Sequence, residues 1–341
     1  MNTPRTARPD PPPPRRPRRR WALAGAASAL AVGLAAGALV LVPGRPGAAA
    51  PGPVTVLTTV ATSGSVSGVA DGPDGLWVTD DLADRLIHLD PTTGATIGRA
   101  VAVPGRPTAV VEADGRLWVA SMLTDTVEGV DPGTGTVTST TSVPSGPVSL
   151  AAAGGDVWVA SVLTGAVTAL DPATGSVVDG TTLPDGAVRL AADGDGDGVW
   201  VTGATDTLSL VTPEAGGLAV RTTTVGDGPI GVAVAPDGVW VADAGGGSVS
   251  RVDPNTGAVL GTYPVGTDPT ALAAGGGLIW VADGSDDHVR ALDPATGAVT
   301  RDAGALAGTP RQALATPTGV YLAVGSPGSL VRIAGSRTGG P

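Results

Sequence analysis

Short apolar runs alternate with polar, glycine-rich turns from residue 54 to residue 334. Within most runs apolar and polar positions alternate, which is the period of a half-buried β-strand. An aromatic residue recurs at steps of 41, 40, 42, 40, 40 and 41 residues, at Trp77, Trp118, Trp158, Trp200, Trp240, Trp280 and Tyr321. A period of this length, with one aromatic strand in each unit, indicates a seven-unit repeat.

Each unit has the length and the strand pattern of one propeller blade. In the fifth unit we expect four strands, over residues 229–234, 238–242, 248–252 and 258–265. A repeat of equal units favours one closed domain over two separate cores. The sequence therefore predicts an all-β fold, a seven-bladed β-propeller over residues 54–334, preceded by one hydrophobic N-terminal helix.

The seventh unit lacks its outer strand, because only a polar tail follows the expected strand at residues 329–333. Residues 53–60, with the sequence PVTVLTTV, stand before the first unit where an outer strand precedes each later one. We expect this segment to become the outer strand of the seventh blade and so to close the ring, which leaves no free sheet edge.

The third and fourth strands of most units are joined by Asp-Pro-x-Thr-Gly, at residues 90–94, 171–175, 253–257 and 293–297, with a variant at 131–135. Asp can accept backbone N–H groups of the following residues, Pro fixes φ, and Gly supplies a positive φ. These aspartates are therefore interpreted as turn residues and not as metal ligands.

The six tryptophans of the repeat are interpreted as structural. Each occupies the same place in the second strand of its unit and is followed by Val: Trp77, Trp118, Trp158, Trp200, Trp240 and Trp280. A column so regular indicates packing between neighbouring blades, where one Trp buries on the order of 200 Å². No aromatic residues remain for a sugar-binding platform.

The N-terminus divides into a basic tail and an apolar run. Residues 1–20 are rich in Pro and Arg and are expected to be a disordered cytoplasmic tail. Residues 21–43 are long enough to cross a membrane as a helix. Seven arginines precede this run, which predicts a cytoplasmic N-terminus with the propeller outside. Residues 44–53 are expected to be a linker, and residues 335–341 a disordered tail.

A cleaved signal peptide is the alternative for the same segment. Ala48, Ala49 and Ala50 offer a small-residue cleavage site, and residues 18–21 loosely resemble a twin-arginine signal. In that case the protein is secreted after cleavage near Ala50; otherwise it is a single-pass protein of the cell membrane. Both interpretations place the propeller outside the cytoplasm.

Charge differs between the N-terminus and the repeats. Residues 1–50 contain eight arginines and one acid, whereas residues 51–341 contain 12 arginines and 30 acids, a net charge of −18. Such a body is repelled by phosphate backbones and anionic lipids, so no nucleic-acid partner is expected. Cys and Lys are absent, which excludes disulfides, thiol nucleophiles and lysine Schiff bases.

The units WVADAGGGSVSRVDPNTGAVLGTYPVG and WVADGSDDHVRALDPATGAVT resemble the YVTN repeats of YncE-like propellers. More distantly they are similar to NHL and quinoprotein (PQQ-type) repeats. The resemblance covers residues 54–334 and implies a seven-bladed propeller. For function it implies little, because proteins with such repeats serve as ligand sensors, interaction platforms and occasionally enzymes.

Streptogramin lyases also resemble the chain in blade architecture, and they use His and Glu around a metal at the central face. Their tryptophan strand typically runs into Glu, whereas here it runs into Asp80, Ser121, Ser161, Gly203, Asp243 and Asp283. The only histidines, His88 and His288, are interpreted as solvated residues of third strands. The lyase residues therefore transfer to no position of this chain, and no catalytic residue is assigned.

Departures from the repeat point to the central channel. Nine residues before the aromatic residue, the first strand carries small residues suited to crowding near the axis, at Gly68, Ala109, Gly231 and Ala271. Ser149 and Gln312 break this column, and so does Arg189 if blade 4 contains a two-residue insertion between its first strand and Trp200. Arg311 adjoins Gln312. We expect these four residues either to bind a carboxylate or another anion, or to fill the axis with water.

Two groups of aspartates are further candidates. Asp80, Asp81, Asp243, Asp283, Asp286 and Asp287 are expected on one face, as a solvated rim or as a surface for cations or a basic protein. Asp193, Asp195 and Asp197 match the start of a calcium loop, but Ala204 stands where an EF-hand needs Glu. A glycine-rich hairpin is the alternative for this second group, with Ca²⁺ as the only cofactor considered.

The sequence predicts an exported, membrane-tethered propeller that acts as a non-catalytic ligand-binding or protein-interaction module. Its partner is an unidentified protein or small molecule, with contact to the membrane through residues 21–43 if these are not cleaved. Two alternatives stay open. One is a metal-dependent lyase or hydrolase of the streptogramin-lyase type, and the other is a purely structural protein of the cell envelope.

Overall fold

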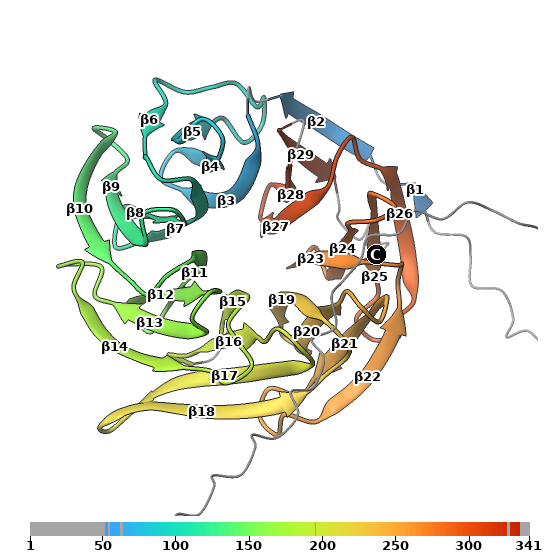
Figure 1. Cartoon of the computed structure of the whole chain (residues 1–341). Helices are drawn as coiled ribbons and strands as arrows, with labels where there is room; N and C mark the ends of the chain where they lie inside the picture. Colours follow the sequence, from blue (N-terminus) through green and yellow to red (C-terminus); the bar gives the residue numbers. More distant parts are fainter. Residues whose placement is uncertain (1–51, 54, 62–63, 195, 326–327, 335–341) are drawn as a thin grey trace, which may run out of the picture. The chain divides into compact units, whose positions relative to one another are not determined.

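The computed structural model describes residues 52–53, 55–61, 64–194, 196–325 and 328–334. Within these ranges every regular element is a β-strand and no helix is present. The strands form seven sheets around a central opening, as Figure 1 shows. The prediction of an all-β, seven-bladed propeller is confirmed.

The first three blades follow one another directly along the chain. Blade 1 consists of β3 (Val66–Gly72), β4 (Gly75–Asp80), β5 (Arg85–Leu89) and β6 (Val101–Ala102). Blade 2 consists of β7 (Pro107–Ala113), β8 (Arg116–Ser121), β9 (Thr126–Asp131) and β10 (Thr136–Ser142). Blade 3 consists of β11 (Pro147–Ala153), β12 (Asp156–Ser161), β13 (Ala166–Leu170) and β14 (Val177–Thr182).

The next three blades have the same strand order. Blade 4 consists of β15 (Arg189–Ala192), β16 (Val199–Thr202), β17 (Thr207–Glu214) and β18 (Gly217–Thr224). Blade 5 consists of β19 (Pro229–Ala235), β20 (Gly238–Asp243), β21 (Ser248–Val252) and β22 (Val259–Pro264). Blade 6 consists of β23 (Pro269–Gly275), β24 (Leu278–Asp283), β25 (His288–Leu292) and β26 (Val299–Ala305).

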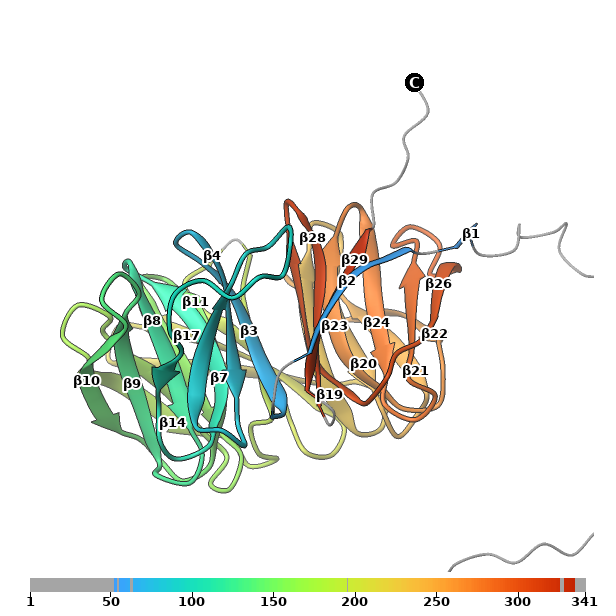
Figure 2. The same ribbon diagram turned by 90° about the horizontal axis from the view of Figure 1, so that it is seen from above.

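Blade 7 combines both ends of the described chain. It consists of β27 (Pro310–Thr316), β28 (Gly319–Val324), β29 (Ser329–Ala334) and, at its outer edge, β2 (Thr55–Ala61), which runs antiparallel to β29. The short β1 (Gly52–Pro53) pairs parallel with β26 of blade 6. Figure 2 shows β2 alongside β29 from a second direction.

The ring is closed by its innermost strands, which contact each other in order from β3 through β7, β11, β15, β19 and β23 to β27. The strand β27 in turn contacts β3. Close approach explains the small residues of this column: a Cβ added to Gly231 would lie 2.9 Å from the carbonyl oxygen of Thr270 on the next blade.

The tryptophans lie in the core between neighbouring blades. Trp77 of blade 1 packs with Leu117 and Val119 of blade 2, and all three side chains are buried. Tyr321 takes the equivalent place in blade 7, and its hydroxyl donates a hydrogen bond of 2.7 Å to the carbonyl of Pro91. Replacing such a buried aromatic by Ala typically costs about 3–5 kcal/mol, so this column is a main source of blade-to-blade stability.

The turns between third and fourth strands have the predicted form. The Asp90 Oδ1 atom accepts the backbone N–H groups of Thr92 and Thr93, at 2.9 and 2.7 Å. Gly94 has φ 71°, in the left-handed region that favours glycine. These bonds hold the pKa of the Asp90 carboxyl below its usual value. The prediction that these aspartates are turn residues is confirmed.

Residues 1–20, 21–43, 44–51 and 335–341 lie outside the described residues. Among the residues that are described, no helix is long and apolar enough to cross a membrane. The interpretations of the N-terminal segments as tail, anchor or signal peptide, and linker therefore stay predictions.

Candidate functional site: the central channel

The innermost strands of all seven blades line a central channel. A narrow cavity of about 90 Å³ lies among them, bordered by Ser149, Arg189, Arg311 and Gln312 together with small and apolar residues. A wider cavity of about 420 Å³ shares Arg189 and Arg311 with it and also reaches Asp81, Arg106 and Met122. We call this wider cavity the mouth. It lies at the end of the channel where second strands run into third strands.

Arg189 is the first residue of β15 and extends from blade 4 into the channel. Its Cα is paired with that of Thr202, just as Ala109 is paired with Ala120 in blade 2, so the expected alignment across the blade 4 insertion is confirmed. Its Nη1 atom donates to the carbonyls of Val148 and Val188, at 3.5 and 3.3 Å. No carboxylate of the described residues forms an ion pair with its guanidinium.

Two effects hold the pKa of Arg189 below its usual value. Burial in the channel is the larger, and repulsion by the charge of Arg311 is the second. The Arg189 side chain is half-buried and borders both cavities, so water reaches it, but the desolvation is sufficient to oppose its charge. A cation in this position is stabilised by any anion that enters the channel.

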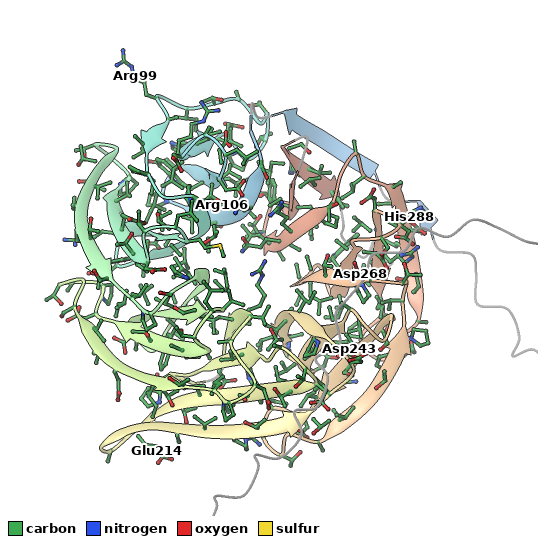
Figure 3. All side chains as sticks on the ribbon, viewed as in Figure 1. Arg99, Arg106, Glu214, Asp243, Asp268 and His288 are labelled. Carbon is green, nitrogen blue, oxygen red and sulfur yellow. The ribbon has the colours of Figure 1, made fainter. Side chains whose placement is uncertain are left out.

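The mouth is cationic. Arg311, in β27, is exposed and borders both cavities. Arg106 adds a third guanidinium, whose Nε lies 3.3 Å from the buried Asp81 carboxylate. Figure 3 shows Arg106 near the central opening, whereas Arg99 and Glu214 lie at the outer rim. Among the described residues that line the mouth, Asp81 is the only acid, so two guanidinium groups are left without a carboxylate there.

Ser149 and Gln312 connect neighbouring blades. The Ser149 hydroxyl accepts the backbone N–H of Leu190 in blade 4 at 3.0 Å. The Gln312 Oε1 atom accepts the backbone N–H of Val69 in blade 1, also at 3.0 Å. Both residues line the channel as the sequence suggested, and each one's hydrogen bond gives a structural reason for breaking the column of small residues.

The aspartates that end second strands are buried. Asp80, Asp243 and Asp283 hold this position in blades 1, 5 and 6, and each is 0 to 1% exposed. Asp283 accepts the backbone N–H groups of Thr267 and Asp268 at 2.7 and 3.0 Å. Asp80 binds the Ser65 N–H and forms an ion pair of 2.9 Å with Arg85. These carboxylates fasten the loop that enters their own blade.

Burial acts differently on two of these carboxyl groups. In Asp243 it raises the pKa, because the hydroxyl hydrogen bonds of Ser250 and Ser248 only partly offset the desolvation. In Asp283 burial also opposes ionisation, but backbone N–H groups outweigh it and the pKa is lowered. Asp283 is therefore an anion, whereas Asp243 is held closer to its neutral form.

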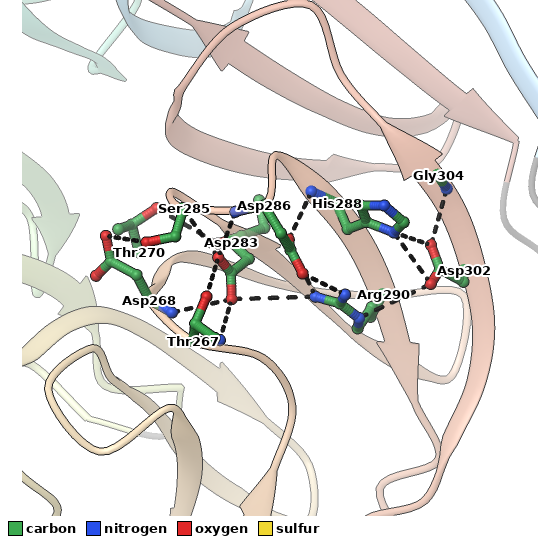
Figure 4. Close-up of polar contacts among 11 residues, drawn as sticks. Thr267, Asp268, Thr270, Asp283, Ser285, Asp286, His288, Arg290, Asp302 and Gly304 are labelled. Atoms are coloured by element: carbon green, nitrogen blue, oxygen red, sulfur yellow. Dashed lines mark hydrogen bonds and ion pairs between the residues drawn. The ribbon is translucent and has the colours of Figure 1, made fainter. Parts of the chain in front are cut away.

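Asp283, Asp286 and Asp302 surround Arg290, as Figure 4 shows. Its guanidinium lies 2.5 Å from Asp286, 3.8 Å from Asp302 and 4.0 Å from Asp283. His288 joins the network through Nδ1, 2.9 Å from Asp302, and lies toward the outer side of blade 6 in Figure 3. Three carboxylates thus converge on the Arg290 guanidinium, and His288 reaches this network only through Asp302. Asp287 is half-buried and has a left-handed backbone, with φ 59°.

His88 has a packing role. Its ring stacks on Trp77, with 4.3 Å between ring centroids and 6° between planes. Arg251 and Arg332 take the same place opposite Trp240 and Tyr321, 5.6 and 5.9 Å from the ring centroids. His88, Arg251 and Arg332 thus share one position, opposite the aromatic residue of their blade. The recurrence of a flat or delocalised side chain at this position could have indicated the stacking from the sequence.

The stretch considered as a calcium loop forms a hairpin turn. Asp193 Oδ1 accepts the Trp200 Nε1–H at 3.0 Å, and the Asp193 N–H donates to the Gly198 carbonyl at 2.9 Å. Asp195 lies outside the described residues. Among the residues described, no group of three or more His, Cys, Asp or Glu side chains is placed to hold a metal ion.

Comparison with known proteins identifies the fold. No family model matches the chain, and no curated protein matches it. Among solved structures it is similar to virginiamycin B lyase from Staphylococcus aureus, with TM-score 0.70 and 13% identity over 81% of this chain and 98% of that one. It is also similar to a streptogramin B lyase, with TM-score 0.68 and 17% identity over 82% and 96%.

A further match is the WD40 domain of Neurospora crassa Pan2, with TM-score 0.67 and 11% identity over 83% of this chain and 96% of that domain. The lyases and the WD40 domain share the propeller architecture with this chain at very low sequence identity. These likenesses establish the fold alone, and the function has to be argued from the site.

Proposed function

We propose that this protein is a non-catalytic binding module whose ligand places an anionic group, such as a carboxylate, against Arg189 and Arg311. One observation carries the proposal: Arg189 holds its charge inside the channel beside a second arginine, and no carboxylate of the described residues is paired with it. A ligand anion would supply the missing counter-charge.

The energetic argument concerns desolvation. A guanidinium withdrawn from water is costly unless it is paired, and breaking a buried ion pair typically costs about 3–5 kcal/mol because one charge is left alone. Arg189 is only half-buried, so its own cost is smaller, but it has the same sign. Binding of an anion relieves this cost and the repulsion from Arg311 together. Arg side chains suit the role because their fork of donors matches a carboxylate.

The surroundings make such a site local. The body of the protein carries 30 acids against 12 arginines over residues 51–341, so an anion is repelled by most of the surface. At the mouth the balance is reversed, because Arg106, Arg189 and Arg311 face a single acid among the described lining residues. The site therefore selects a ligand whose anionic group fits into the channel, and the net charge of the protein does not attract the ligand.

We also propose the setting in which the module works. The apolar run over residues 21–43, preceded by seven arginines, supports a single-pass anchor with the propeller outside, or secretion after cleavage near Ala50. The pairing of β2 with β29 supports ring closure by the N-terminal segment. The YVTN-like units support a relation to YncE-like propellers. No resident metal or cofactor is part of the proposal.

Isothermal titration calorimetry of the full-length chain in a mild detergent tests the anion site. Citrate, phosphate and acetate are titrated into the wild type and into Arg189→Gln, Arg311→Gln and, as the matched control at the exposed rim, Arg99→Gln. We expect binding of at least one anion, with Kd raised about tenfold or more by Arg189→Gln, a loss of about 1.4 kcal/mol, and unchanged by Arg99→Gln.

The stability of the ligand-free variants separates binding from folding. Because no carboxylate of the described residues is paired with Arg189, Arg189→Gln should leave the melting midpoint unchanged or raise it. If no anion binds, or if Arg189→Gln binds as the wild type does, the proposal is wrong. A purely structural role for the propeller would then be the better account.

A further inference from the structure

Three leucines stand exposed at equivalent positions of adjacent blades. Leu82, Leu123 and Leu163 are 66, 71 and 70% exposed. Each lies two residues after the second strand of its blade, β4, β8 or β12, which end at Asp80, Ser121 and Ser161. We call these three residues the leucine arc. Blades 4, 5 and 6 carry Thr205, Gly245 and Ser285 at the same place, so only one side of the ring is apolar there.

The leucine arc adjoins the mouth. In blades 1 and 2 the residue before the leucine, Asp81 or Met122, lines the mouth itself. Consecutive Cα atoms are about 3.8 Å apart, so Leu82 and Leu123 begin immediately outside this cavity. The cationic channel and the apolar arc are therefore two parts of one surface.

The turns that carry the arc are held in place. In blade 2 the N–H of Leu123 donates to the carbonyl of Gly105 at 2.9 Å, and the N–H of Met122 donates to Arg106 at 3.1 Å. In blade 3 a Cβ added to Gly146 would lie 2.6 Å from Leu163 Cγ, so the leucine occupies the space that this glycine leaves free. The leucines are thus presented by ordered turns, which lowers the entropy lost on binding.

We propose that the leucine arc and the mouth together bind an extended protein segment in which a carboxylate is flanked by large apolar side chains. The inference rests on the proposed function, because the carboxylate is the anion at Arg311 and Arg189. The apolar side chains cover Leu82, Leu123 and Leu163, whose exposure has no other use in the fold. Larger exposed apolar patches rimmed by polar residues typically mark interaction sites.

The chemistry favours a protein segment over a small molecule or a lipid surface. The three leucines come from three blades, so a small ligand seated in the channel does not cover them, whereas an extended chain does. A flat membrane would meet Thr205, Gly245 and Ser285 as well, and anionic lipids are repelled by the acidic body. Charge complementarity at the mouth requires an acidic group on the segment.

A peptide selection tests the inference. Random peptides with free C-termini are displayed and selected against the full-length chain in mild detergent. We expect enrichment of sequences with Asp, Glu or the terminal carboxylate within a few residues of large apolar side chains. The best sequence is then synthesised, and its binding is measured by fluorescence anisotropy, together with an analogue in which the carboxylate is replaced by an amide.

Matched variants assign the contacts. The triple variant Leu82→Ser, Leu123→Ser, Leu163→Ser should bind the peptide at least about tenfold more weakly than the wild type does. The amide analogue should bind the wild type as weakly as the original peptide binds the triple variant. The control, Thr205→Ala with Ser285→Ala, changes the same turns in blades 4 and 6 and should bind as wild type. All five positions are at the surface of turns, so unchanged circular dichroism and melting should accompany each variant.

Three outcomes overturn the inference. They are the absence of any enriched peptide, a peptide that binds the triple-leucine variant as tightly as wild type, and self-association of the chain that the triple variant abolishes. The last result would assign the arc to a second copy. Calorimetry with citrate or phosphate separates the two proposals: if small anions still bind through Arg189, only the docking inference fails, and if they do not, both fail.

Discussion

Arg189 of blade 4 and Arg311 of blade 7 border the same channel, and the charge of Arg311 adds to burial in lowering the pKa of Arg189. Like charges placed together without a counter-charge are unfavourable for folding. The stability of the ring therefore does not explain why these two arginines lie together. Arg290 of blade 6, by contrast, is engaged by three carboxylates.

The hydrogen bond of Ser149 predicts a cost for its removal. In Ser149→Ala the buried N–H of Leu190 loses its acceptor, which should destabilise the fold by about 1–3 kcal/mol. Ser176→Ala is the matched control, because Ser176 is exposed and bonds only within its own turn. Thermal unfolding of the two variants measures the difference. Equal midpoints would show that the bond between blades 3 and 4 contributes nothing.

The raised pKa of Asp243 predicts a pH-dependent effect. A carboxyl group whose pKa is higher in the folded than in the unfolded state stabilises the fold when it is protonated. This contribution is complete below about pH 3.8, the ordinary pKa of Asp, and is lost as the pH rises through the pKa of the folded state. Asp243→Asn removes this dependence, so the midpoint of the variant relative to wild type should rise between about pH 3.5 and about pH 7. Melting curves across this range measure the trend.

Asp253→Asn is the control with the opposite sign. The pKa of Asp253 is lowered by backbone hydrogen bonds from Thr256 and Asn255. The ionised Asp253 carboxylate stabilises the fold when the pH is above the pKa of the unfolded state. This contribution is lost as the pH falls through the pKa of the folded state. The midpoint of this variant relative to wild type should therefore fall over the same rise in pH. Parallel trends for the two variants would contradict the assignment.

The sequence predicted the blades well because their signal repeats. Trp77 and its equivalents pack in one environment seven times, so their spacing of about 40 residues reports a structural period directly. The turn at residues 90–94 was equally readable, because Asp90 binds N–H groups two and three residues further on. Local chemistry of this kind needs no knowledge of the fold.

The roles of the site residues depended on distant partners. Gln312 binds the N–H of Val69, which is 243 residues away, and Asp283 binds an N–H 16 residues before it. Nothing near Asp283 in the sequence distinguishes a buried loop anchor from a solvated carboxylate. The expected acidic face is accordingly reduced in the structure, since Asp80, Asp81 and Asp243 are buried.

Metal dependence is predicted to be absent. One carboxylate oxygen of Asp193 already accepts a hydrogen bond from Trp200. Among the described residues, no group of three or more acidic, His or Cys side chains is placed to hold a metal ion. The melting midpoint of the full chain should therefore be the same in millimolar calcium, in magnesium and in chelator, because only a ligand of the native state raises it. A clear rise with calcium, removed by Asp193→Asn and Asp197→Asn, would contradict this prediction.

The proposed closure of the ring by the N-terminal segment predicts that a disulfide can be engineered there. The Cα atoms of Thr58 and Arg332 are partners in the antiparallel pair of β2 and β29, and the natural chain contains no Cys. Thr58→Cys with Arg332→Cys should cross-link under mild oxidation, because facing antiparallel residues lie within disulfide reach. Non-reducing gel mobility reports the cross-link.

The control places the second cysteine across the ring. Thr224 ends β18 on the outer side of blade 4, away from blade 7 in Figure 1. Thr58→Cys with Thr224→Cys should form no intramolecular disulfide. If the two pairs behaved alike, residues 53–60 would not be fixed at the edge of blade 7.

The most direct test of the anion site is crystallographic. Crystals of the full chain soaked in bromide are measured at the bromine absorption edge, with Arg189→Gln as the matched variant. The account predicts an anomalous peak between the guanidinium groups of Arg189 and Arg311 in the wild type, lost in the variant. Bromide bound only elsewhere, with none between these two arginines, would contradict it.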